Sequence, residues 1–96
     1  MKTGIFKVLI SDKLSEGAIK IFQQNDILVD SKPHIGAVPD ELIKIIGNYD
    51  GLAVRSNTKV SSQLIAKATR LKVIGRAGIG VDNIDILAAS AKGIIV

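Results

Sequence analysis

The chain has 96 residues and a formal net charge of +4, and 47% of its residues are hydrophobic but only 3% aromatic. That length suffices for one small domain, whose aliphatic core suits a parallel sheet buried under helices. With no cysteine and a single histidine, disulfide scaffolds and thiolate zinc sites are excluded, and we expect no metal site.

Short apolar runs alternate with helix-like segments through the first half of the chain. Residues 6–12 and 27–30 are predicted strands, rich in β-branched residues and bounded by polar ones. Between them lies a predicted helix that begins at its N-cap Ser15 and ends near Gln24. A second helix, over residues 39–47, starts with proline and two acidic residues and ends at glycine.

The second half repeats this alternation. Residues 51–56 and 71–75 are predicted strands, with a helix over residues 61–68 between them. A glycine-rich loop, GRAGIGVDN at residues 75–83, precedes a fourth helix that is capped by one of the last two residues of the loop. The last three residues, IIV, are the fifth predicted strand.

The alternation of strands and helices predicts a parallel sheet with right-handed crossover connections and helices on both faces. We therefore expect an α/β fold of the flavodoxin-like, doubly wound type, with five parallel strands in the order 2-1-3-4-5. Because the fifth strand runs to Val96, we also expect residues 1–96 to be one domain cut from a longer chain. A complete five-stranded domain is the alternative.

Two arginines are predicted at the edge of the sheet where ligands bind in doubly wound folds, beyond the carboxyl ends of the strands. Arg55, followed by Ser56, ends the third strand, and Arg76 ends the fourth, its neighbour in the expected order. Their guanidinium groups, with backbone N–H groups exposed at Gly78 and Gly80, suit a carboxylate or a phosphate. Taken singly, each arginine also fits a surface ion pair and the glycines fit a tight turn. The prediction of a small-anion site therefore depends on their combination.

The loop at residues 75–83 departs from the known nucleotide-binding motifs. The dinucleotide fingerprint G-x-G-x-x-G requires a third glycine for close helix packing, and Asn83 stands at that position. The Walker pattern and the G-x-S-x-G elbow of serine hydrolases are absent, and His34 has no evident acidic partner in the sequence. We therefore predict no cofactor-binding residue and no catalytic residue in this chain.

The basic residues are spread along the chain, without the clustering and the aromatic residues typical of nucleic-acid binding, so they indicate a solvated surface. No run reaches the roughly 20 apolar residues of a membrane span. The short apolar run at the start is interrupted by charges and is not a signal peptide. We expect a cytoplasmic protein with no nucleic-acid partner and no membrane partner.

Three linked patterns stand in residues 51–96: VRS-x-T-KV, LKVIGRAG-x-GVDNID and A-x-x-KGI-x-V. Together they strongly resemble the D-isomer-specific 2-hydroxyacid dehydrogenases, above all the branch that acts on 3-phospho-D-glycerate, and residues 1–50 are compatible. The resemblance implies that this chain is the flavodoxin-like substrate domain of an NAD-dependent oxidoreductase. It also implies that a Rossmann domain with the NAD site and the catalytic Arg, Glu and His follows position 96, so the chain alone is expected to be inactive.

The same resemblance implies roles for residues of the candidate site. The family's strand-end arginine and serine match Arg55 and Ser56, near the phosphate or carboxylate of the substrate, and its second arginine matches Arg76. The segment around Asn83 matches a structural part that fixes the loop on the following helix. The loop amides that grip the substrate carboxylate match four consecutive residues: Ala77, Gly78, Ile79 and Gly80.

The implied activity is the oxidation of 3-phospho-D-glycerate to 3-phosphohydroxypyruvate by hydride transfer to NAD, which opens serine biosynthesis. The enzyme is expected to be a homo-oligomer. A non-catalytic module of the same fold, which binds a small anion or serves as a scaffold, is the alternative function.

Overall fold

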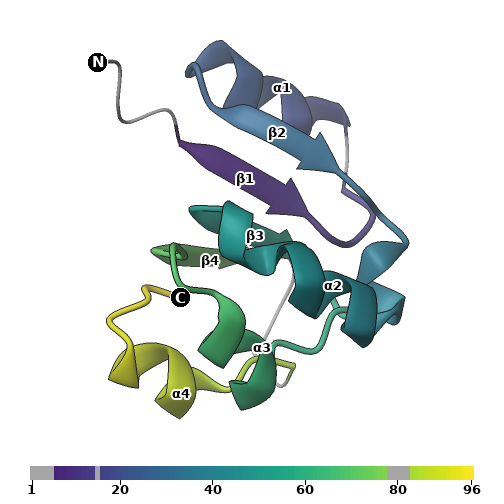
Figure 1. Ribbon diagram of the computed structural model, residues 1–96. Helices are drawn as coiled ribbons and strands as arrows, with labels where there is room; N and C mark the ends of the chain where they lie inside the picture. Colours follow the sequence, from purple (N-terminus) through teal and green to yellow (C-terminus); the bar gives the residue numbers. More distant parts are fainter. Residues whose placement is uncertain (1–5, 15, 78–82) are drawn as a thin grey trace.

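The computed structural model describes residues 6–14, 16–77 and 83–96. Within these ranges, four parallel strands form a sheet in the order β2-β1-β3-β4 (Figure 1). The predicted α/β class with parallel strands is confirmed, and the predicted order agrees for these four strands. They are β1 (Lys7–Ile10), β2 (Leu28–Ser31), β3 (Gly51–Val54) and β4 (Val73–Arg76).

Helices alternate with the strands, as the sequence predicts. In the described part of the chain, none of them has the length and apolar composition needed to cross a lipid bilayer. Two short 3₁₀ turns, η1 (Ile35–Ala37) and η2 (Ile46–Asn48), flank the second helix. The α-helices are α1 (Glu16–Gln24), α2 (Pro39–Ile45), α3 (Ser62–Lys67) and α4 (Ile86–Ala91).

The caps of the last two helices show where local signals succeed and fail. Ser61 caps α3 as predicted, and its hydroxyl accepts the Leu64 N–H at 3.2 Å. The cap of α4 is Asp85, which accepts the Ala88 N–H at 3.0 Å, so the prediction of Asp82 or Asn83 as the cap is wrong. The Asn83 side chain has other partners, described below. Ser15, the predicted cap of the first helix, and Asp82 lie outside the described residues.

The predicted fifth strand is also wrong. Of the last three residues, only Ile95 pairs with β4, through an isolated parallel bridge to Val73. The N–H of Ile94 instead donates to Ala89 O (2.9 Å) in the last turn of α4, and its side chain is buried in the core. Because the first residue of the run still belongs to the helix end, the segment adds one bridge beside β4 and not a strand.

The helices cover the two faces of the sheet unequally (Figure 1). Alternate residues of a strand point to opposite faces. Leu9 and Leu52 therefore pack with α2, α3 and α4 in the larger core, whereas Val8, Ile10 and Ala53 pack under α1 in a smaller one. This alternation fixes the register of the strands, and so decides which residues reach the carboxyl edge together.

On the α1 side the sheet is only partly covered. A Cβ added at Gly75, in β4, would meet no atom within 4 Å. An apolar groove of about 250 Å³ lies beside α1, lined by Phe6, Val8, Phe22, Ile27, Gly51, Leu52, Ala53, Val73 and Gly75.

Tyr49, the only tyrosine of the chain, lies just before β3 and is 4% exposed. Its hydroxyl donates to Asp30 Oδ2 at 2.6 Å, and the Lys7 ammonium lies 5.0 Å from its ring centroid. Burial, followed by the hydrogen bond and the negative charge of Asp30, raises the pKa of Tyr49 to about 12.

We expect the phenolate absorbance to titrate with a midpoint near pH 12 in the folded chain, and near the unperturbed value of about 10 in denaturant. Because the folded state holds this proton more tightly, the free energy of unfolding should fall as the pH rises from about 10 toward 12. Asp30→Asn should lower the midpoint only partway, since burial is the largest cause of the raised pKa. A folded-state midpoint at the denatured value would contradict this prediction.

Candidate functional site

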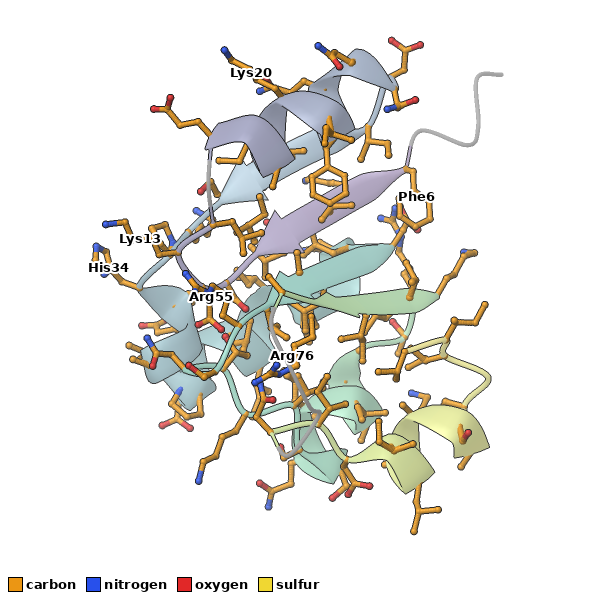
Figure 2. The ribbon with its side chains drawn as sticks, turned by 180° about the vertical axis from the view of Figure 1, so that it is seen from behind. Phe6, Lys13, Lys20, His34, Arg55 and Arg76 are labelled. Carbon is orange, nitrogen blue, oxygen red and sulfur yellow. The ribbon has the colours of Figure 1, made fainter. Side chains whose placement is uncertain are left out.

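The carboxyl ends of the parallel strands meet at one edge of the sheet, and both candidate arginines lie there (Figure 2). Arg76 ends β4 and pairs in register with Val54 of β3, and Arg55 is the next residue along the chain. Figure 2 shows Lys13 at the same edge, whereas Phe6 lies at the opposite end of β1. The structure therefore brings Arg55 and Arg76 to neighbouring strand ends.

A buried aspartate that follows β1 holds the loop that carries Arg55. Asp12 is 1% exposed. Its Oδ2 accepts the backbone N–H groups of Arg55 (2.5 Å) and Thr58 (3.1 Å), and its Oδ1 accepts the Thr58 hydroxyl (2.8 Å). Because that hydroxyl donates to Asp12, the Ser11 hydroxyl, 2.7 Å away, donates to Thr58. The carboxylate of Asp12 is thus occupied by donors of the loop and has a structural role.

Gly36, in η1, closes another side of this carboxylate. Its N–H donates to Ser11 O at 3.0 Å. A Cβ at this position would lie 2.7 Å from both Asp12 Oδ1 and Ser11 O, and it would overlap the Thr58 hydroxyl. The loop after β2 therefore packs so closely on Asp12 that a side chain cannot fit without a shift of the surrounding atoms.

Asn83 joins the segments that follow β3 and β4. Its Nδ2 donates to Arg55 O (2.6 Å) and Thr58 O (2.7 Å), while its Oδ1 accepts Arg76 Nε (2.8 Å). The backbone of Asn83 is held in turn, because the Val60 N–H donates to its carbonyl at 2.7 Å. One half-buried side chain thus contacts both arginine-bearing strand ends.

Of the other predicted site residues, some are exposed at this edge and one has its backbone N–H engaged within the sheet. Arg55 and Ser56 are exposed, and Arg55 Nη1 donates to Lys13 O at 3.4 Å. The Ala77 N–H, predicted to grip a substrate carboxylate, donates instead to Val54 O (2.9 Å) and extends the pairing of β3 and β4. That amide is therefore engaged within the sheet. Three members of the predicted set lie outside the described residues: Gly78, Ile79 and Gly80.

The predicted site does not include the residues that support this edge, Asp12, Gly36 and Thr58. Asp12 carries one usable signal, because an ionisable residue directly after a buried strand needs partners of its own. Gly36 indicates only a turn, since nothing local reveals that it packs against Asp12. Thr58 is one of several polar residues after β3, and its burial follows only from the fold.

A hollow of about 500 Å³ lies beyond the end of β2. It is lined by Ser31, Lys32, Pro33, His34, Ile35, Val38 and Glu41. Among these described lining residues there is neither Arg55 nor Arg76.

The described residues do not fit a dinucleotide cofactor. The third glycine of the fingerprint allows close packing of the helix, but Asn83 stands there with its amide bonded to three groups of the neighbouring segments. Helix α4 begins only at Ile86, behind its cap Asp85. Within the ranges that the structure covers, no three side chains of the His, Asp and Glu types are grouped to hold a metal ion.

Comparison with known protein families relates the chain to a family of enzymes. The profile described as D-isomer specific 2-hydroxyacid dehydrogenase, catalytic domain, matches residues 8–96. The chain is 50% identical over 90 residues to the D-3-phosphoglycerate dehydrogenase of Methanocaldococcus jannaschii, and 47% identical over 90 residues to that of Homo sapiens. These alignments cover 94% of this chain but only 17% and 16% of the relatives, so the chain spans less than a fifth of their length.

Solved structures share the fold. The PH0520 protein from Pyrococcus horikoshii OT3 superposes with a TM-score of 0.84 at 31% identity, over 93% of this chain and 26% of that one. An NAD+-bound 3-phosphoglycerate dehydrogenase from Entamoeba histolytica superposes with a TM-score of 0.75 at 27% identity, over 96% of this chain and 32% of that one. In both proteins the shared fold is part of a longer chain.

Proposed function

The chain belongs to the D-isomer specific 2-hydroxyacid dehydrogenase family, within the catalytic domain, and we propose that residues 1–96 are the domain of such an enzyme that binds the acid substrate. The observation that carries the proposal is the pairing of strand ends that brings Arg55 and Arg76 together, with Asn83 bonded to both. Two guanidinium groups at one edge supply donors that a carboxylate or a phosphate accepts. Ser56 and the backbone N–H groups of Gly78, Ile79 and Gly80 complete the set of contacts that we propose.

We propose 3-phospho-D-glycerate as the substrate. Relatives at 50% and 47% identity bear the name D-3-phosphoglycerate dehydrogenase. This acid carries a carboxylate and a phosphate, so two arginines at neighbouring strand ends match its two anionic groups. Its oxidation to 3-phosphohydroxypyruvate would start serine biosynthesis.

In that reaction, the described residues of this chain bind and orient the acid. Arg55 and Arg76 donate to its anionic groups, and Asp12 holds the backbone of the loop that carries Arg55. A substrate held in one orientation reaches the transition state with a smaller loss of entropy. Because the described residues do not fit a dinucleotide, we propose that residues outside this chain bind NAD and carry the acid–base groups.

A homo-oligomeric enzyme is also part of the proposal. Leu28, on the edge strand β2, is 52% exposed, and Ile95, beside β4, is 70% exposed. Apolar side chains at both edges of the sheet suit contacts with another subunit.

Calorimetric titration of this chain with 3-phospho-D-glycerate tests the proposal. We expect Arg55→Ala and Arg76→Ala each to weaken binding about 10- to 150-fold, which corresponds to the loss of one hydrogen bond to a charged group. Arg70→Ala is the matched control and should leave the affinity unchanged. Arg70 donates to Asp50, which precedes β3, and therefore lies at the other end of the strands.

Titrations with D-glycerate and D-lactate, which lack the phosphate, test the proposed substrate separately from the proposed binding of a 2-hydroxy acid. Equal affinity for all three acids would support the binding of a 2-hydroxy acid but would reject a phosphorylated substrate. Failure of the unmodified chain to bind any of them, or unchanged affinity in both arginine variants, would reject the anion site and favour the scaffold alternative.

A further inference from the structure

Asn83 contacts the two arginine-bearing strand ends through opposite ends of one amide. We propose that Asn83 is a positioning residue that orients the Arg76 guanidinium and ties it to the backbone of Arg55, so that the two arginines recognise a doubly charged acid as one unit. This inference rests on the proposed function for its ligand, but its structural part can be tested without any ligand.

The chemistry of the amide determines its orientation. Arg76 Nε can only donate, so it must face the amide oxygen, 2.8 Å away. The two carbonyl groups, of Arg55 and Thr58, can only accept, so they must face the amide nitrogen, at 2.6 and 2.7 Å. Both donor hydrogens and the acceptor of Asn83 are therefore used. Aspartate would keep only the acceptor, and glycine would keep neither.

The contact with Arg76 controls the plane of its guanidinium. The group is rigid and planar, so a hydrogen bond at Nε restricts rotation of the whole fork. The bond to Asn83 is made at Nε and leaves the end formed by the two Nη atoms outside that contact. That end is the one that binds a carboxylate or a phosphate end-on, through two parallel hydrogen bonds. Asn83 thus sets the direction in which Arg76 presents its Nη atoms.

The contact of Asn83 with Arg55 and the contacts of Asp12 hold the same loop from two sides. Asp12 accepts the N–H groups of Arg55 and Thr58, while Asn83 donates to the carbonyl groups of the same two residues. The loop is held from the end of β1 on one side and from the segment after β4 on the other. Asn83 itself is held, because Val60 bonds its carbonyl and the Asp85 N–H donates to Val60 O at 2.8 Å. A contact residue supported in this way keeps its ligands in a preorganised geometry.

A purely structural role for Asn83 predicts different results. A residue that only held the loop in place would change the stability of the chain, and its effect on ligand affinity would simply add to that of Arg76. A positioning residue acts through Arg76, so its effect on affinity should vanish when Arg76 is absent.

The first test is NMR of the arginine Nε–H groups in the chain without ligand. Arg76 Nε–H, assigned with Arg76→Lys, should exchange with solvent roughly tenfold more slowly than an unbonded Nε–H, as expected for one hydrogen bond of about 1.4 kcal/mol. Asn83→Ala should abolish this protection. Asn83→Asp should retain it, because a carboxylate oxygen still accepts. Asn48→Ala, at an exposed asparagine of η2, is the control and should change nothing.

The second test is a double-mutant cycle on the affinity for 3-phospho-D-glycerate. Asn83→Ala alone should weaken binding about tenfold, whereas adding it to Arg76→Ala should weaken binding further by less than about twofold. Fully additive effects on the affinity would overturn the inference. An Arg76 Nε–H that is unprotected in the unmodified chain would also overturn it, and this result does not depend on whether any variant folds. Should the unmodified chain bind no acid, the proposed function fails, and the NMR result alone decides whether Asn83 orients Arg76.

Discussion

Replacing Asp12 with alanine is expected to lower the free energy of unfolding by roughly 3–5 kcal/mol, because three donors lose their acceptor at a buried position. The donors are the N–H groups of Arg55 and Thr58 and the Thr58 hydroxyl. A domain of this size has a total stability of about 5–15 kcal/mol. The variant should therefore be close to unfolding at room temperature, as measured by urea denaturation followed by circular dichroism.

Two further substitutions show whether the loss comes from these hydrogen bonds. Asp12→Asn keeps the shape of the side chain but presents one acceptor oxygen instead of two, so it should lose about 1–3 kcal/mol. Asp40→Ala, an exposed acid in the first turn of α2, should lose less than about 1 kcal/mol. If Asp12→Ala were as stable as the Asp40 variant, the assigned role of Asp12 would be wrong.

Gly36→Ala is expected to lower the free energy of unfolding by about 2–4 kcal/mol, because a methyl group enters a space that is already filled. The new Cβ would lie 2.7 Å from Asp12 Oδ1 and from Ser11 O, and both belong to the packed base of the site. To admit it, the loop after β2 must move away or Thr58 must leave Asp12. The second response also displaces the backbone of Arg55, so we expect weaker binding of 3-phospho-D-glycerate together with the loss of stability.

Gly75→Ala is the matched control for this substitution. A Cβ there would have no neighbour within 4 Å, so the free energy of unfolding should change by less than about 0.5 kcal/mol. Denaturation curves of the two variants, measured side by side, decide the question. Equal stability would show that the close contact at Gly36 is relieved by small shifts, and that the site does not depend on glycine there.

The strand ends could be predicted from the sequence because the signals for them are local. β3 and β4 are short apolar runs in a chain of alternating strands and helices, which predicts parallel strands with their carboxyl ends at one edge. Arg55 and Arg76 follow or end these runs and lie at that edge in the structure. Their role in binding an acid stays a prediction.

The two errors, the fifth strand and the cap of α4, arose where the local preference of a residue competed with another contact. IIV at the end of the chain has the composition of a strand, but Ile94 completes the end of α4 and only Ile95 pairs with β4. Asn83 is a good N-cap by residue type, but its amide bonds to Arg55, Thr58 and Arg76, and Asp85 caps the helix. At Ile94 the end of the preceding helix outweighed the preference for a strand, and at Asn83 contacts distant in the sequence outweighed the preference for a cap.

The sequence by itself determined the class of fold, the order of the four strands and the placement of two arginines at one edge. These features follow from hydrophobic periodicity and chain connectivity, which act over a few residues at a time. Only the tertiary structure decided that Asp12, Gly36 and Asn83 organise this edge. The physical reason is that their hydrogen bonds join segments far apart in the chain, such as Asp12 to Thr58 and Asn83 to Arg55. Those pairings form only when the packed sheet has brought the strand ends together. At Asp12 and Thr58 the fold also excludes the water that would otherwise satisfy the same polar groups.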